Sequence, residues 1–188
     1  MDALSERLAS LPVPPAGRRL ALRVGAKGAR AMRAGHPWLF EDSIERLSHE
    51  GAPGDVAIVF DAKGGFLAAG IFDPLSTVRV KVLAHGDRAA LDASFFETRL
   101  KAALAAREGS IPPGTDAFRA VNGESDGFPG LVSDIYAETA VFKTYSAAWL
   151  PWIGACAKAL RSALPSASRM VIRLSRELQR LQIGRAHV

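Results

Sequence analysis

Three short apolar runs, separated by residues that favour turns, constrain the fold of this chain most strongly. The first run, 56–60, is rich in β-branched residues, and the segment 61–65 after it ends in two glycines that can adopt the positive φ of a hairpin turn. The second run, 66–72, is closed by Asp73-Pro74, and the third, 77–83, alternates apolar and polar residues. These runs therefore predict consecutive antiparallel strands.

The residues around these runs extend the same pattern. Residues 20–24 are predicted to form an earlier strand, a basic helix follows, and the chain then stays extended or mixed to residue 47. Several short strands with one early helix describe a small, mostly antiparallel β-barrel, which we assign to residues 20–86. Residues 1–19 contain three prolines and are predicted to be a flexible leader.

A second unit is predicted from about residue 90 to residue 180. Asp92 is a suitable N-cap for an amphipathic helix that runs to about Arg107. The later elements follow in the order strand, strand, strand, helix, strand, at 118–121, 131–136, 140–145, 149–164 and 168–174. This order predicts an α+β domain.

Charge is distributed unevenly along the 188 residues. Residues 1–40 carry seven Lys/Arg against two Asp/Glu (+5), and residues 169–188 carry five against one (+4), whereas the whole chain has a net charge of +5. Basic character at both ends is a modest indication of nucleic-acid binding.

The same composition argues against several other kinds of protein. One cysteine excludes an internal disulfide and a cysteine-based metal cluster, and the four histidines are too scattered to suggest a metal site. The chain has no apolar run of about 18 residues and no signal-peptide pattern, so we expect a cytoplasmic protein without a membrane segment.

The densest basic segment lies early in the chain. Lys27, Arg30 and Arg33 recur every third residue, which places three cations on one side of a short helix. Gly35 can end that helix in the left-handed conformation.

An aromatic turn follows this helix. Pro37 stiffens the backbone beside His36 and Trp38, so an imidazole and an indole lie next to the three cations. That combination suits a phosphate backbone with a base or sugar to stack on. In the alternative interpretation, Trp38, Leu39 and Phe40 begin a core strand and the cations form a solvated face.

The segment from Asn122 to Gly130 is the second dense motif, with three glycines, one proline and two carboxylates. Glu124 and Asp126 could form an acid/base pair, or they could hydrogen-bond their own backbone in a tight turn. The spacing matches neither an EF-hand nor a dinucleotide or Walker motif. Cys156 lies within an amphipathic helix and is predicted to be a buried structural thiol. Since no motif in the chain resembles a complete active site, we predict no catalytic residue.

Together these motifs resemble one family, the bacterial S-adenosylmethionine-dependent large-subunit rRNA cytosine-C5 methyltransferases. The resemblance is carried by Lys27-Gly28, Arg33, His36 to Phe40, Gly54-Asp55, Gly70, Asp73 to Ser76, Arg79-Val80 and Gly123 to Leu131. It implies an RNA-binding PUA domain, a small α+β connecting domain and a Rossmann-like methyltransferase domain.

The resemblance also implies roles for individual residues. The residues expected to face RNA are Lys27, Arg30, Arg33, His36 and Trp38. The residues expected to brace the connecting domain near the substrate cleft are Gly123, Glu124, Ser125, Asp126, Gly127, Pro129 and Gly130.

The cofactor-binding turn and the nucleophilic cysteine of the family would follow the end of this chain. We therefore expect the Rossmann-like domain to be missing, and this piece alone to bind rRNA weakly, bind no S-adenosylmethionine and catalyse nothing. Residues 182–188 can be back-translated into the start of a common sequencing adapter, so 181–188 are expected to be a non-native tail. The alternative function is a free-standing PUA-type RNA-binding module, and the oligomeric state stays open.

Overall fold

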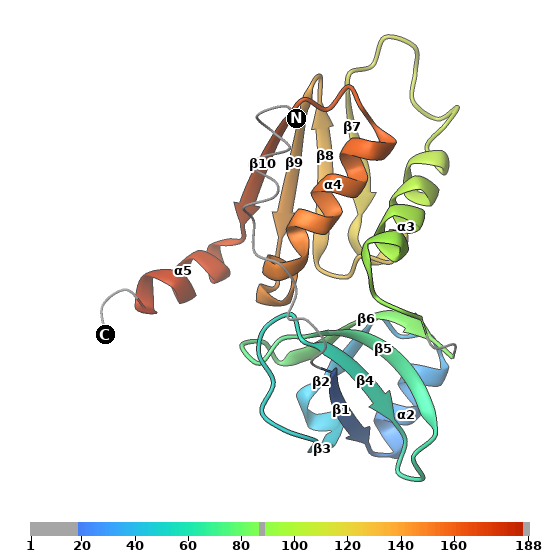
Figure 1. Ribbon diagram of the computed structural model, residues 1–188, viewed down its shortest axis with the longest axis vertical. Coiled ribbons are helices and arrows are strands. Elements are labelled where there is room, and N and C mark those ends of the chain that lie inside the picture. The colour runs from blue at the N-terminus through green and yellow to red at the C-terminus, as the bar shows by residue number, and fades with distance from the viewer. Residues whose placement is uncertain (1–18, 87–88, 186–188) are drawn as a thin grey trace.

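The computed structural model of the chain describes residues 19–86 and 89–185, without the side chains of 181–185. Figure 1 shows two β-sheets, one at the lower end of the molecule and one at the upper end. We call residues 19–86 the first domain and residues 89–185 the second domain. Nearly all of the predicted leader and the last three residues of the predicted tail lie outside the described residues.

The first domain contains one six-stranded sheet. Its elements are β1 (Arg19–Val24), α2 (Ala26–Arg33), β2 (Trp38–Phe40), the 3-10 turn η1 (Glu41–Ser43), β3 (Ile44–Leu47), β4 (Val56–Phe60), β5 (Phe66–Phe72) and β6 (Val78–His85). The strand order is β2-β6-β5-β4-β1-β3, and β4, β5 and β6 pair antiparallel as their turns predict. β1 pairs parallel with β4, so the sheet is mixed.

Alternation along the strands builds the first core. In β1, Leu20, Leu22 and Val24 are buried while the residues between them are half-buried or exposed, as expected for a strand with one face on the core. α2 contributes Ala29 and Met32 to the same core. Full burial of a methionine such as Met32 contributes about 1.5–3 kcal/mol, so the apolar side of α2 holds the helix on the core and its cations remain outside.

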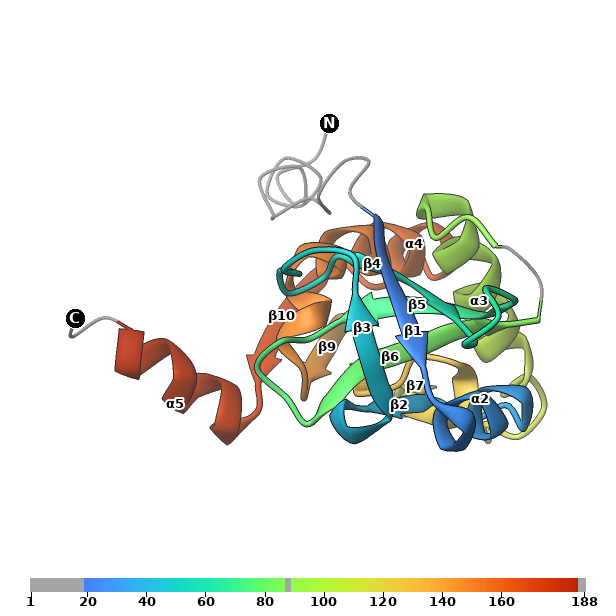
Figure 2. The same ribbon diagram turned by 90° about the horizontal axis from the view of Figure 1, so that it is seen from below.

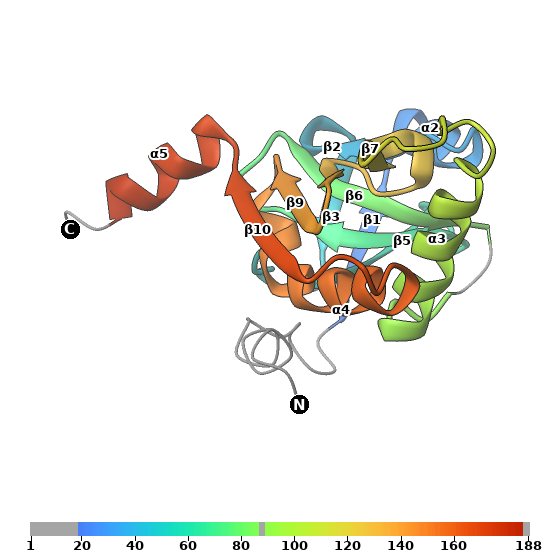
Figure 3. The same ribbon diagram turned by 90° about the horizontal axis from the view of Figure 1, so that it is seen from above.

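The second domain contains a four-stranded sheet with two helices. Its elements are α3 (Ala93–Ala105), β7 (Ala117–Asn122), the 3-10 turn η2 (Gly123–Asp126), β8 (Leu131–Tyr136), β9 (Thr139–Thr144), the 3-10 helix η3 (Ala147–Trp152), α4 (Ile153–Ala163), β10 (Arg169–Leu174) and α5 (Arg176–Arg185). The strand order is β10-β9-β8-β7, and α3 and α4 lie on the same face of this sheet (Figures 1 and 3).

Local signals set the helix boundaries of this domain. The Asp92 side chain accepts a hydrogen bond from the Phe95 backbone N–H at 3.0 Å, which confirms the predicted N-cap of α3. The single helix predicted at 149–164 is instead divided into η3 and α4, with Pro151 inside η3. Proline has no backbone N–H to donate, so an α-helical start is weakened there.

The second core reaches into the first domain. It is built around Trp149, Phe96 and Phe128, and it includes Ile71 of β5 and Leu83 of β6. The Trp152 indole N–H also donates to the Gly54 carbonyl at 2.8 Å. The face of β6 that carries Leu83 is therefore covered by the second domain.

The predicted fold class requires a correction in the second domain. The sequence predicts an α+β connecting domain with no Rossmann-like part, but β9, α4 and β10 form a strand–helix–strand unit in which the two strands pair in parallel. This crossover is the unit that Rossmann-like sheets repeat. Apolar periodicity within one strand does not reveal the direction of its partner, which is why the sequence prediction missed it.

Candidate nucleic-acid interface

The three cations of α2 share its solvent-exposed side, opposite the buried Ala29 and Met32. Lys27 Nζ lies 2.8 Å from Asp42 Oδ2, and an Arg33 nitrogen lies 2.7 Å from Asp61 Oδ2. Both cations are exposed, and an exposed pair such as Lys27–Asp42 contributes about 0–1 kcal/mol, so a phosphate group can compete for Lys27 at little cost.

The turn after α2 gathers three aromatic rings on the surface. Gly35 adopts φ +77°, and His36 Nδ1 lies 3.2 Å from the backbone N and 3.0 Å from the backbone O of Trp38. The Trp38 ring centroid lies 5.9 Å from that of His36 and 6.3 Å from that of Phe40. A purely core strand at this point is excluded, because only Leu39 is buried while Trp38 and Phe40 keep 37% and 40% of their surface exposed.

The aromatic turn contacts the acidic loop of the second domain. The Trp38 indole N–H donates to Glu124 Oε1 at 3.0 Å, although the two residues are 86 positions apart in sequence. The same carboxylate oxygen accepts from the Gly130 backbone N–H at 3.1 Å. The structure thus joins the two motifs that sequence reasoning identified separately.

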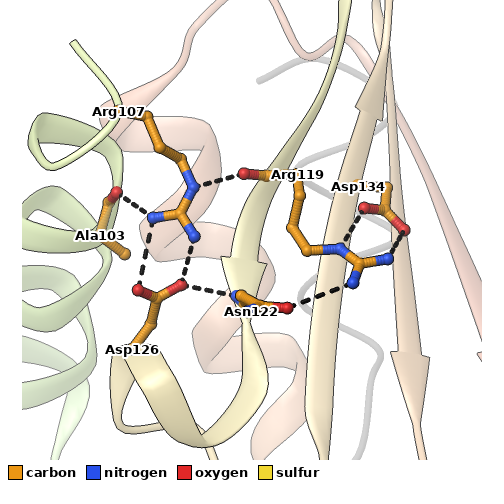
Figure 4. Close-up of polar contacts among 6 residues, drawn as sticks. All are labelled: Ala103, Arg107, Arg119, Asn122, Asp126 and Asp134. Carbon is orange, nitrogen blue, oxygen red and sulfur yellow. Dashed lines mark hydrogen bonds and ion pairs between the residues drawn. The ribbon is translucent and has the colours of Figure 1, made fainter. Parts of the chain in front are cut away.

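Asp126 is engaged within the fold. Its carboxylate accepts from an Arg107 nitrogen at 2.6 Å and from the Asn122 backbone N–H at 2.6 Å, as Figure 4 shows. Arg119, bound to Asp134 at 2.9 Å, continues this chain of contacts through Asn122. Of the two interpretations of the loop, the tight turn whose carboxylates hydrogen-bond their own backbone describes both Glu124 and Asp126.

The loop also ties the second domain to the first. Gly127 adopts φ +73°, and its carbonyl accepts from an Arg99 nitrogen at 2.7 Å, while another nitrogen of Arg99 donates to the Leu83 carbonyl of β6 at 2.7 Å. A side chain on Gly127 would approach Arg99 to 2.8 Å. Phe128 is fully buried, and the Pro129 carbonyl accepts from the Trp149 indole at 2.8 Å.

Sequence reasoning missed a polar cluster at the contact between the domains. Lys81 is buried and donates to the Val78 carbonyl at 2.7 Å. Burial lowers the pKa of Lys81, and the negative charges of Asp73, Glu124 and Glu177 oppose this shift. Asp73 in turn accepts from the Ser146 hydroxyl at 2.5 Å. The alternation of residues 77–83 placed Lys81 correctly opposite the valines but gave no sign that another domain covers that face.

Other kinds of site find little support in the part of the chain that the structure describes. No group of three or more His, Cys, Asp or Glu side chains is arranged there to hold a metal ion. No helix in that part is both long and apolar enough to cross a bilayer. Burial raises the pKa of the Cys156 thiol, which disfavours the reactive thiolate.

Comparison with known proteins identifies relatives of both domains. Residues 22–85 match a PUA-like domain. A ribosomal RNA large-subunit methyltransferase of Deinococcus radiodurans is 42% identical over 165 residues, which are 85% of this chain and 40% of that protein. Ribosomal RNA large-subunit methyltransferase I of Alteromonas mediterranea is 38% identical over 119 residues, 63% of this chain and 30% of the relative. The chain spans less than half the length of these relatives.

Two solved structures share the fold. A proposed SAM-dependent methyltransferase from Streptococcus mutans matches with a TM-score of 0.72, and SMU.776, a proposed methyltransferase in complex with SAH, matches with 0.73. Both are 17% identical, and each match covers 82% of this chain and 40% of the other. That coverage is too large for the first domain alone. The prediction that the Rossmann-like methyltransferase domain is missing was therefore wrong, because the matches to these methyltransferase structures include the second sheet and its helices.

Proposed function

We propose that this chain, which belongs to the family of ribosomal RNA large-subunit methyltransferases with a PUA-like domain, binds large-subunit rRNA and takes part in its methylation. We further propose that the methyl donor is S-adenosylmethionine and that the methyl acceptor is C5 of a cytosine. The protein would act in the cytoplasm.

The observation that carries this proposal is the extent of the similarity. The match to the Deinococcus radiodurans methyltransferase extends over 165 residues and so includes both domains. A PUA-like domain shared by chance with an unrelated enzyme would account for residues 22–85 only.

The surface of α2 and the aromatic turn supports the RNA-binding part of the proposal. We propose that Lys27, Arg30 and Arg33 contact phosphates and that His36 and Trp38 stack against a base or sugar. We further propose that the loop from Gly123 to Gly130 holds the two domains in register near the substrate, through Glu124 and the Arg99 contacts.

The described residues lack one element of an S-adenosylmethionine site. Neither β9 nor β10 is followed there by the glycine-rich turn that lets the backbone approach a nucleotide. These residues by themselves do not fit S-adenosylmethionine. The expectation that this chain alone binds no cofactor stays a prediction.

The test is genetic, because it uses the protein as the cell makes it. The gene is deleted in the source organism, and methylated nucleosides of purified large-subunit and small-subunit rRNA are compared by mass spectrometry. We expect the loss of one 5-methylcytidine from large-subunit rRNA and its return when the gene is restored.

Each other outcome has a definite meaning. Loss of a different methylated nucleoside from large-subunit rRNA would retain the methyltransferase and refute the C5 assignment. Unchanged methylation of both rRNAs would refute the enzyme assignment and favour the RNA-binding module.

A further inference from the structure

Within residues 19–86 and 89–185, the sheet of the second domain has one face that no helix covers. α3 and α4 both cover the opposite face, and Figure 3 shows the strands with these helices on one side only. The register places Tyr136 beside Thr139, Lys143 beside Arg173 and Thr139 beside Arg169. Since alternate residues of a strand share a face, Tyr136, Lys143, Arg169 and Arg173 all lie on this helix-free face.

This face is basic. Four cations from its strands, Arg119, Lys143, Arg169 and Arg173, stand against one carboxylate, Asp134, which is paired with Arg119 at 2.9 Å. The raised pKa of Arg119, caused first by its hydrogen bond to Asp134, agrees with that pairing. The remaining excess of positive charge suits a polyanion.

The same face exposes two large aromatic rings. Tyr136 and Tyr145 keep 55% and 50% of their surface accessible, and Lys143 Nζ lies 4.7 Å above the Tyr145 ring centroid. Tyr136 pairs with Thr139, which precedes Tyr145 by six residues, so the rings are about 20 Å apart along the strand direction. Lys143, on β9 next to the strand that carries Tyr136, lies between the two rings along this direction.

We propose that the helix-free face of the second sheet, from Tyr136 to Tyr145, binds single-stranded RNA. The two rings stack on bases, and Lys143, Arg169 and Arg173 contact phosphates. A single strand fits this arrangement because its bases expose their flat faces, which a duplex hides by stacking.

The position of this face supports the same partner. Figures 2 and 3 both show α2 and β2 on the side of the molecule away from α4, the helix that covers the other face of the second sheet. The hydrogen bond from Trp38 to Glu124 joins the aromatic turn to the loop that follows β7 of this sheet. RNA held by α2 can therefore continue onto the second sheet. This inference rests on the proposed function for the identity of the RNA, and it adds a second contact surface for it.

The test measures binding of the full chain to a fluorescein-labelled, unstructured RNA of about 12 nucleotides, a length within the usual range for such surfaces. Fluorescence anisotropy gives the Kd at several salt concentrations. Tyr136→Ala and Tyr145→Ala are each expected to weaken binding about fivefold or more. Tyr136→Phe keeps the ring and should stay within about twofold of the original Kd.

The charge contribution is tested with a matched pair of lysines. Lys143→Ala should lower the slope of log K against log salt by about 0.7, the value for one phosphate contact on a single strand. Lys158 is exposed on α4, on the covered side of the sheet, so Lys158→Ala should leave the slope unchanged. Circular dichroism of each variant shows whether the fold is retained.

Two results would overturn this inference. One is that the original chain does not bind the oligonucleotide, and the other is that the folded Tyr136→Ala and Tyr145→Ala variants bind it with the same Kd as the original chain. If either result is found but the double variant Arg30→Ala/Arg33→Ala binds rRNA more weakly than the original chain, the proposed function is retained and only the binding surface on the sheet is refuted. Conversely, tyrosine-dependent binding together with unchanged rRNA methylation after gene deletion would retain the surface and refute the proposed function.

Discussion

At the scale of single residues, the hydrogen bond from Trp38 to Glu124 connects the aromatic turn of one domain to the acidic loop of the other. A double-mutant cycle with Trp38→Phe and Glu124→Ala isolates it, because Phe keeps an aromatic side chain but has no N–H donor, and the cycle cancels the cost of the smaller ring. We expect a coupling free energy of about 0.5–1.5 kcal/mol, measured by urea unfolding. Additive effects of the two substitutions would mean that the bond contributes nothing to stability.

His85 provides a test by pH. Burial lowers the pKa of His85 below its usual 6.5, the hydrogen bond with the Met32 carbonyl opposes this, and the charges of Arg99 and His36 add to it. Below pH 6.5 the unfolded chain takes up this proton before the folded chain does, so stability falls as the pH falls toward the folded-state pKa.

Proton NMR titration gives the His85 pKa directly, with His85→Gln to assign the resonance. A midpoint at or above 6.5 would contradict the proposed effect of burial. In that case the pH dependence of stability around neutrality would have to come from other groups.

Sequence reasoning at this scale predicted residue positions better than residue partners. The three-residue spacing correctly placed Lys27, Arg30 and Arg33 on one side of a helix. It gave no information on Asp42 and Asp61, because both lie in other elements and reach the cations only through the fold.

At the scale of elements, the two arginine–carboxylate ion pairs in Figure 4, Arg107–Asp126 and Arg119–Asp134, differ mainly in how deeply they are buried. Arg107 and Asp126 keep 19% and 12% of their side chains exposed, whereas Arg119 and Asp134 keep 51% and 23%. Arg107→Ala should lower the free energy of unfolding by about 3 kcal/mol, since it leaves a largely buried carboxylate without its cation.

Arg119→Ala is the matched control, with an expected loss below about 1 kcal/mol because its pair is more exposed. Denaturant titration measures both variants. Similar losses in the free energy of unfolding for the two variants would show that burial does not determine how much each ion pair contributes to stability.

Most strands could be predicted because their signals are local. The runs at 56–60 and 66–72 coincide with β4 and β5, since glycine, aspartate and proline residues mark their ends. The parallel pairing of β9 with β10 was missed because it depends on the crossover through α4, which no single run encodes. The short strand β3 and the helix α5 lacked a comparable local signal.

At the scale of the whole molecule, the two domains share one contact region that the sequence did not reveal. Gly54, Lys81 and Leu83 belong to the first domain, yet each lies against the second. Strand periodicity predicts which residues share a face, but not which face another domain will cover.

The chain's single cysteine reports on the opening of the second domain. Cys156 is fully buried within α4, so we expect it to react with a thiol reagent only when the surrounding core opens. Absorbance with Ellman's reagent should show almost no reaction in native buffer and one thiol per chain in urea. Rapid reaction of the folded chain would show that this core is not closed.

The central claim is that large-subunit rRNA lies along the side of the molecule that carries α2, the aromatic turn and the helix-free sheet. Ultraviolet cross-linking of the full chain to total bacterial RNA, followed by mass spectrometry of peptide–nucleotide adducts, tests it most directly. We predict adducts on peptides that contain Trp38, Tyr136 and Tyr145, with large-subunit rRNA as the enriched RNA. Adducts confined to α3 and α4, or no preference for large-subunit rRNA, would contradict the claim.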